Sequence, residues 1–195
     1  TQTSILDPNI KPAINTSSEF GFDTKFFKNR IGLNFTYYIE NRKNEIIPIS
    51  ISKGSGYDTF LTNAGESERK GVEITFNATP VKTEDFNWDF TFNFGKNKTT
   101  VISLPGDLTS LNAPGGSDAY GFATVVHELG NQWGQLKGTA IKRDAQGNAV
   151  INANGTYAVN PGQYLGSVLP DFTGGIINSV RYKNFSLNAA IDFQK

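Results

Sequence analysis

Residues 86–95 read FNWDFTFNFG, and large aromatic side chains alternate with polar or small ones throughout this stretch. The aromatic positions are Phe86, Trp88, Phe90, Phe92 and Phe94. Successive side chains of a β-strand point to opposite faces, so this period of two places all five rings on one side of a strand. The same alternation recurs at 18–26, 31–42, 71–79 and 185–193, and more weakly at 172–182. No segment has a helical period, and the sequence therefore predicts an all-β protein.

The composition excludes several classes of protein. Lys plus Arg equals Asp plus Glu at 18 each in 195 residues, so the chain lacks the basic surplus of a nucleic-acid-binding protein and we expect no nucleic-acid partner. The absence of cysteine excludes disulfides and thiolate metal sites. No stretch approaches the ~20 apolar residues of a transmembrane helix. A membrane β-barrel is compatible with these facts, because its strands alternate in polarity.

The predicted connections are alternately short and long. Segments 27–30, 80–85 and 183–184 are short, whereas 43–70 and 97–171 are long. Short turns at one end of antiparallel strands and long loops at the other are typical of outer-membrane barrels. In such a topology the stretch 97–171 holds an even number of barrel strands, zero included, with candidates at 120–127 and 133–143. The chain would then contribute six to eight strands.

The two faces of these strands allow different interpretations. In a soluble β-sandwich the apolar face would form the core. In a membrane barrel the apolar face would contact lipid and the polar face a watery lumen. Strands of about 10–12 residues exceed the usual five or six and match the 9–11 that span a bilayer, which favours the barrel. A complete small outer-membrane barrel, acting as an anchor or an enzyme, is the other membrane alternative; the ends of the sequence favour a fragment of a longer protein.

Several short segments, taken in order, resemble the SusC/RagA branch of the TonB-dependent outer-membrane receptors. PNIKP at 8–12, followed by EFGFD at 19–23, is similar to the family signature NPxLKPE…E-G, with Ala13 at the usual glutamate position. The other similar segments are FFKNRIGL at 26–33, NAGE at 63–66, KGVEI at 70–74, FNFGKNK at 92–98 and parts of 165–192. The resemblance covers nearly the whole chain.

This resemblance implies an antiparallel transmembrane β-barrel of 22 strands, closed by an N-terminal plug domain. Residues 1–195 would be part of that single barrel domain and would contain no plug. The family imports glycans, oligosaccharides or peptides across the outer membrane of Bacteroidetes. A SusD-like surface lipoprotein covers the barrel as a lid, and TonB supplies energy through the plug. The resemblance implies no enzymatic activity and no cofactor.

Aromatic residues in the long loops are the candidate substrate-binding residues, because aromatic rings stack on sugar faces and loops often carry binding function. These candidates are Tyr57, Phe60, Tyr120, Trp133 and Tyr157. The competing interpretation is that these rings pack the loops together or touch the lid protein.

The sequence predicts neither a catalytic residue nor a metal site. His127-Glu128 resembles the start of a zinc-protease motif, but His127 is the only histidine, and a zinc site needs about three protein ligands. The charged residues between Glu66 and Glu73 include both signs, which is typical of a solvated rim rather than of a catalytic carboxylate pair.

Overall fold

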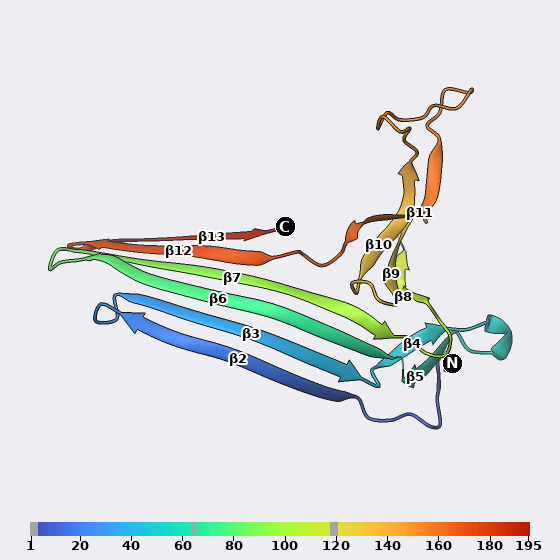
Figure 1. The fold of residues 1–195 in the computed structure, drawn as a ribbon, viewed down its shortest axis with the longest axis horizontal. Coiled ribbons are helices and arrows are strands. Elements are labelled where there is room, and N and C mark those ends of the chain that lie inside the picture. Colours follow the sequence, from blue (N-terminus) through green and yellow to red (C-terminus); the bar gives the residue numbers. More distant parts are fainter. Residues whose placement is uncertain (1–3, 64, 118–120) are drawn as a thin grey trace. The chain divides into compact units, whose positions relative to one another are not determined.

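The computed structural model describes residues 4–63, 65–117 and 121–195, which form β-strands, connecting loops and one short 3-10 helix (Figure 1). The elements are β1 (Ser4–Leu6), β2 (Ile14–Phe26), β3 (Ile31–Lys43), β4 (Ile46–Ser50), η1 (Lys53–Ser55), β5 (Thr59–Asn63), β6 (Glu66–Lys82), β7 (Phe86–Ser103), β8 (Ser110–Ser117), β9 (Ala123–Glu128), β10 (Gln135–Ile141), β11 (Val159–Ser167), β12 (Thr173–Tyr182) and β13 (Phe185–Gln194). Within these described ranges, no helix is long and apolar enough to cross a membrane. The all-β prediction is confirmed.

Six long strands form one sheet in the order β13-β12-β7-β6-β3-β2. Long strands that follow one another in the chain are therefore neighbours in the sheet (Figure 1). Short turns join β2 to β3, β6 to β7 and β12 to β13 at one end, and the long connections leave from the other end. The predicted alternation of short and long connections is confirmed. Every strand predicted from period-two alternation lies in this sheet.

The register of the sheet confirms the predicted faces. β12 pairs with β7 from Thr173↔Gly95 to Tyr182↔Phe86, and with β13 from Thr173↔Gln194 to Tyr182↔Phe185. The aromatic side chains of neighbouring strands therefore share a face. Three ring pairs on this face have centroid separations of 5.4–6.4 Å: Phe22 with Phe35, Phe76 with Phe90, and Phe92 with Phe193.

This apolar face is exposed on the outer strands β2 and β13, and its rings on the central strand β7 are half-buried. Phe185 is 78% exposed, Leu187 68% and Phe20 67%. The buried apolar side chains among the described residues are Val101, Leu104 and Val126, and all three lie outside residues 15–41, 68–99 and 170–195. An exposed aromatic face cannot be the core of a soluble β-sandwich, so this arrangement favours lipid as its surroundings.

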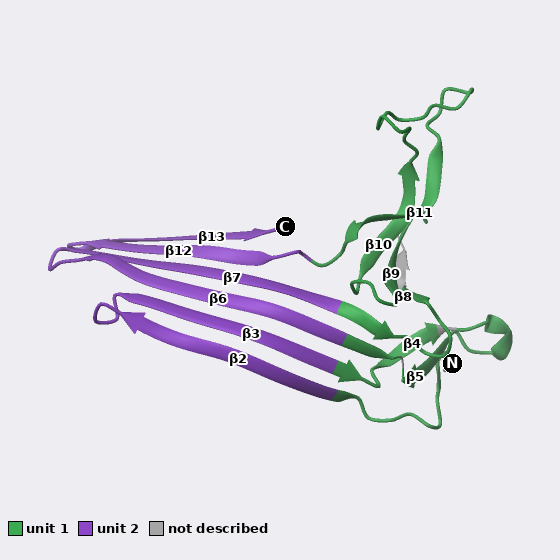
Figure 2. Cartoon of the chain, in the orientation of Figure 1, with its two compact units in different colours: residues 1–14, 42–67, 100–169 green, residues 15–41, 68–99, 170–195 purple. Residues whose placement is uncertain are grey.

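The chain divides into two compact units (Figure 2). One unit, formed by residues 15–41, 68–99 and 170–195, contains most of the six-stranded sheet. The other, formed by residues 1–14, 42–67 and 100–169, contains a three-stranded sheet (β1-β5-β4) and a four-stranded sheet (β11-β10-β9-β8). β1 pairs with β5 in parallel, whereas the other strand pairs with a determined register are antiparallel.

The stretch 97–171 contributes no complete strand to the six-stranded sheet. Its predicted strands at 120–127 and 133–143 correspond to β9 and β10, but these pair with β8 and β11 in a sheet of their own. The described chain therefore supplies six strands to the large sheet, at the lower end of the predicted range. β6 and β7 extend beyond the predicted 71–79 and 86–95, because hydrogen bonding continues where the alternation of polarity ends.

Candidate functional site

The polar face of the six-stranded sheet carries the side chains opposite the aromatic face. Threonine and amide side chains connect β6 to β7 across this face. Thr75 Oγ1 donates to Asn93 Oδ1 at 3.1 Å, and Thr91 Oγ1 donates to Asn77 Oδ1 at 2.9 Å. A third hydrogen bond of 2.7 Å joins Thr79 Oγ1 to a carboxylate oxygen of Asp89. These cross-strand pairs are the expected stabilising unit of a sheet surface that faces water.

A charged and aromatic cluster occupies the same face. Arg69 Nη1 lies 3.9 Å from Glu40 Oε2, and the Arg69 guanidinium carbon lies 5.5 Å from the centroid of the Tyr38 ring. The Tyr38 ring lies against Gly71 on the neighbouring strand, where an added Cβ would overlap it. Glycine at position 71 therefore allows the ring to lie close to the sheet.

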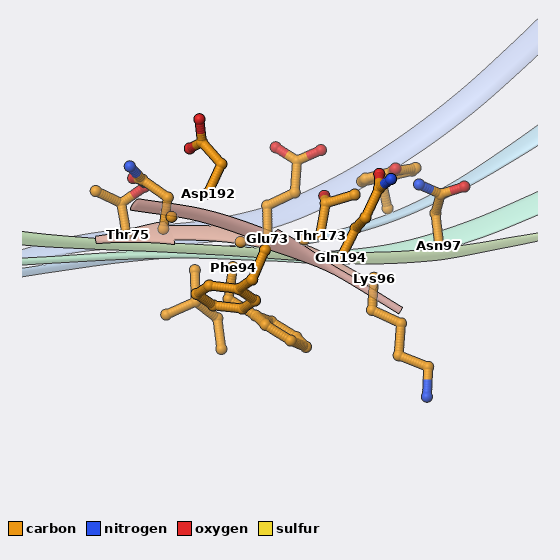
Figure 3. A pocket seen from close by; sticks show the side chains of 15 residues that line it. Glu73, Thr75, Phe94, Lys96, Asn97, Thr173, Asp192 and Gln194 are labelled. Carbon is orange, nitrogen blue, oxygen red and sulfur yellow. The ribbon is translucent and has the colours of Figure 1, made fainter. Parts of the chain in front are cut away.

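An open hollow of about 710 Å³ adjoins this cluster. Its lining includes Tyr38, and its polar side chains include Glu73, Thr75, Asn97, Thr173, Asp192 and Gln194. Figure 3 shows Glu73 and Asp192 on one side of the sheet and Phe94 and Lys96 on the other. Two glycines, Gly95 and Gly175, lie between the strands that carry the two carboxylates. The hollow therefore belongs to the polar face.

The structure distributes the predicted loop aromatics over the two long connections. Tyr57 is half-buried and follows η1, with its backbone N–H 3.3 Å from Ser55 Oγ. Phe60 is half-buried in β5, in register with Ile5 of β1 and Ile49 of β4. Tyr157 is 57% exposed. Tyr120 lies outside the described residues.

Trp133 packs against a buried histidine. Its ring is stacked on His127 with centroids 3.6 Å apart and an interplanar angle of 16°. The backbone N–H of Gly134 donates to His127 Nδ1 at 3.1 Å, and burial lowers the pKa of His127. This contact supports a packing role for Trp133. Among the described residues, none of the four rings at positions 57, 60, 133 and 157 stacks on another of them.

Glu128, which follows His127 in the sequence, is held by two polar neighbours. The Glu128 carboxylate binds Lys137 Nζ at 2.5 Å and accepts a hydrogen bond from Asn131 Nδ2. Within the described part of the chain, no group of three or more histidine, cysteine, aspartate or glutamate side chains could hold a metal ion.

Sequence reasoning missed the hollow on the polar face. Its signal was the occurrence of glycine at polar-face positions of successive strands, at Gly71, Gly95 and Gly175. Gly95 and Gly175 become informative together only when the register of β7 and β12 is known, because a long connection separates them in the sequence.

Known proteins resemble this chain over nearly its whole length. A family model described as TonB dependent receptor-like, beta-barrel matches residues 1–193. TonB-dependent receptor P3 of Formosa agariphila is 28% identical over 207 residues, covering 95% of this chain and 21% of the relative. TonB-dependent receptor SusC of Bacteroides thetaiotaomicron is 25% identical over 197 residues, covering 95% of this chain and 20% of the relative.

Among solved structures, the RagAB peptide importer in the "closed-closed" state matches with a TM-score of 0.73 at 19% identity. That match covers 93% of this chain and 21% of the importer chain. The chain spans about a fifth of the length of the curated relatives it matches. The predicted resemblance and the predicted class, a segment of an antiparallel transmembrane β-barrel, are both confirmed.

Proposed function

This chain belongs to the family of TonB dependent receptor-like β-barrels, and from that premise we propose that it forms part of the wall of an active importer in the outer membrane. Residues 1–195 would be one stretch of a single barrel domain. The six-stranded sheet would face lipid with its aromatic side and the transport path with its polar side. The proposal assigns no catalytic step to this chain.

The observation that supports this proposal is the contrast between the two faces of one sheet. The aromatic face is exposed on residues such as Phe20, Phe185 and Leu187. A bilayer would cover these side chains and remove their apolar surface from water. The opposite face carries hydrogen-bonded threonine and amide side chains, including Thr75 with Asn93. A sheet with these two surfaces separates hydrocarbon from water.

The relatives support a nutrient-uptake role. One relative is named TonB-dependent receptor SusC, and one matching structure is that of the RagAB peptide importer. We therefore propose glycans, oligosaccharides or peptides as cargo and a SusD-like surface lipoprotein as partner. In this proposal TonB acts through a plug domain that is not part of residues 1–195. The proposed location is the outer membrane of a Bacteroidetes-type cell, as the Formosa and Bacteroides relatives suggest.

The long connections would present residues to cargo or to the lid protein. Tyr157 is the best placed of the predicted aromatics, because it is exposed. Tyr57 and Phe60 are half-buried, and Trp133 is stacked on His127. Only the exposed part of each of these rings could contact the cargo or the lid protein.

The test uses the full-length protein in its own host. Cells that carry the gene, cells that lack it and cells that lack TonB are incubated with fluorescent neutral oligosaccharides and with fluorescent peptides. We expect the protein in the outer-membrane fraction and saturable uptake of one cargo class that requires both the gene and TonB. Recovery in the soluble fraction, or uptake that persists without TonB, would contradict the proposal.

A further inference from the structure

We propose that the hollow on the polar face of the six-stranded sheet is a binding subsite for an uncharged, hydroxyl-rich saccharide unit of the cargo. This inference rests on the proposed function and narrows it, because it names a place on the wall and a chemical class. The carboxylates of Glu73 and Asp192, with glycines between them, define the subsite (Figure 3).

The floor of the hollow is formed where side chains are missing. Gly95 of β7 lies beside Thr173 of β12, and Gly175 of β12 lies between Asn93 of β7 and Asp192 of β13. Gly95 leaves the backbone of the sheet open to a ligand, which is a recognised use of glycine within a strand, whereas the Asp192 carboxylate lies over Gly175. The backbone groups of these strands are already paired within the sheet, so a ligand would have to bind through side chains.

The two carboxylates lie on opposite sides of this floor. Glu73 belongs to β6 and Asp192 to β13, three strand spacings apart in the sheet. At about 4.8 Å per spacing their strands are roughly 14 Å apart. One metal ion cannot bridge such a distance, but a sugar ring or a short oligosaccharide can lie between the two groups. The volume of about 710 Å³ is within the usual range for small-molecule sites, roughly 300–1,000 Å³.

The side chains around the floor have free hydrogen-bonding capacity. In the described part of the chain, Glu73, Asn97 and Asp192 make no side-chain hydrogen bond or ion pair, in contrast to the paired Thr75 and Asn93. Carboxylates only accept hydrogen bonds, whereas amides both donate and accept. A saccharide hydroxyl also does both, so it matches this mixture.

The charge of the hollow restricts its ligand. Glu73 and Asp192 give it two negative charges, and Arg69 on this face lies beside Glu40. The Lys96 side chain lies on the other side of the sheet (Figure 3). Like charges repel at these distances, so uronates and sulfated sugars would be disfavoured.

A peptide fits this surface less well than a saccharide does. Extended peptides usually bind to a free sheet edge and insert alternate side chains into pockets. The hollow lies on the face of a sheet, and the apolar side chains of the same strands lie on its opposite face. Tyr38 is the one aromatic residue on the polar-face side of the hollow among the described lining residues.

The decisive variant fills the floor without disturbing the strands. Gly95→Gln is suitable because an added Cβ at position 95 would be 3.6 Å from Thr173 Oγ1, an ordinary contact. Ser179→Gln is the matched control, since position 179 is on the polar face, opposite Asp89 and outside the hollow. A third variant, Glu73→Gln with Asp192→Asn, removes both charges and retains the size of the side chains. All are made in the full-length protein, and their amounts in the outer membrane are measured.

Binding and uptake are measured with three probes of similar length: neutral hexasaccharides, the same sugars oxidised to carboxylates, and a lysine-rich peptide. We expect Gly95→Gln to weaken neutral-sugar binding about tenfold. The added side chain would displace the sugar from the floor, and the loss of one or two hydrogen bonds has an effect of this size. Ser179→Gln should match wild type, and the charge-removing variant should admit the oxidised sugars.

Two outcomes would overturn the inference and leave the proposed function standing. In the first, Gly95→Gln leaves the uptake of neutral sugar at the wild-type level. In the second, Gly95→Gln weakens the binding of the peptide only. If wild-type cells show no TonB-dependent uptake of any probe, the proposed function fails and the inference fails with it.

Discussion

The indole Nε1 of Trp88 donates a hydrogen bond of 3.2 Å to the side-chain oxygen of Asn178 on the neighbouring strand. Both residues are on the apolar face, because Asn178 is in register with Phe90 and Trp88 with Val180. An amide on a lipid-facing surface needs a partner, since hydrocarbon offers none. The tryptophan therefore supplies both apolar surface and the donor that makes Asn178 acceptable at this position.

The first prediction is that Trp88→Phe destabilises the full-length protein by about 1–3 kcal/mol, because the Asn178 oxygen loses its donor. Asn178→Val should cost less, because the lipid-facing surface gains an apolar side chain that offsets the acceptor lost by the indole N–H. Urea unfolding in lipid vesicles of the two single variants and the double variant measures the coupling between the residues. Strictly additive effects would show that the hydrogen bond has no energetic role.

The second prediction concerns Gly174, which is in register with Phe94 and Phe193. An added Cβ at position 174 would overlap the Phe193 ring. Gly174→Ala should therefore destabilise the barrel by about 1–3 kcal/mol, the usual cost of overpacking. Gly95→Ala is the control: its Cβ has room, and the substitution should be neutral or slightly stabilising. The same unfolding measurement distinguishes the variants, and equal costs would argue against the close fit of Phe193.

These residues show what the sequence could and could not reveal. The face of residues 86–95 is readable because the alternating residues are adjacent in the chain. Asn178 could not be assigned a partner in advance, because its contact with Trp88 depends on the register of two strands that are distant in sequence. The hollow could not be predicted for the same reason: only the pairing of β7 with β12 brings Gly95 and Gly175 together on one surface.

The long loop 97–171 was harder to predict because backbone hydrogen bonds determine much of its structure. Residues 142–149 and 150–157 form two similar turns, in which the Gly147 N–H donates to Asp144 O and, eight residues later, the Gly155 N–H donates to Asn152 O. Backbone bonds of 2.8–2.9 Å run from Lys142 to Ala158, from Val150 to Lys142 and from Ala158 to Val150, closing a ring. Asp144 with Gly147, and Asn152 with Gly155, mark the turns in the sequence, but the bonds that close the ring are between backbone groups common to all residues.

The third prediction tests the lipid face. Phe90→Arg places a charge in the middle of the aromatic row and should cost about 2–4 kcal/mol and reduce assembly into the outer membrane. Ser179→Arg is at nearly the same depth, since Ser179 pairs with Asp89, but on the polar face, and it should be tolerated better. Membrane-fraction immunoblots and heat-modifiable mobility on gels measure assembly. Equal tolerance of the two arginines would contradict the face assignment.

The fourth prediction is a pH dependence of the four-stranded sheet. His127 is buried, accepts the Gly134 N–H at Nδ1, and has a pKa that burial lowers below its ordinary value. The unfolded histidine takes up a proton near pH 6.5, whereas the folded one stays neutral to lower pH. The unfolded state therefore binds more protons, and stability is lost as the pH falls below about 6.5.

Protonation would also turn Nδ1 into a donor that faces the Gly134 donor. Glu128, the charged residue next to His127 in the chain, already binds Lys137, so it offers the imidazolium little compensation. Hydrogen-exchange protection of the β9–β10 amides in the full-length protein should therefore fall between about pH 7.5 and about pH 5, on either side of the unfolded-state pKa. The control is His127→Phe, which retains a ring to stack on Trp133 but cannot titrate, so its protection should be lower at neutral pH and insensitive to this change. A wild-type protection factor that stays constant across the same range would rule out a stabilising role for neutral His127.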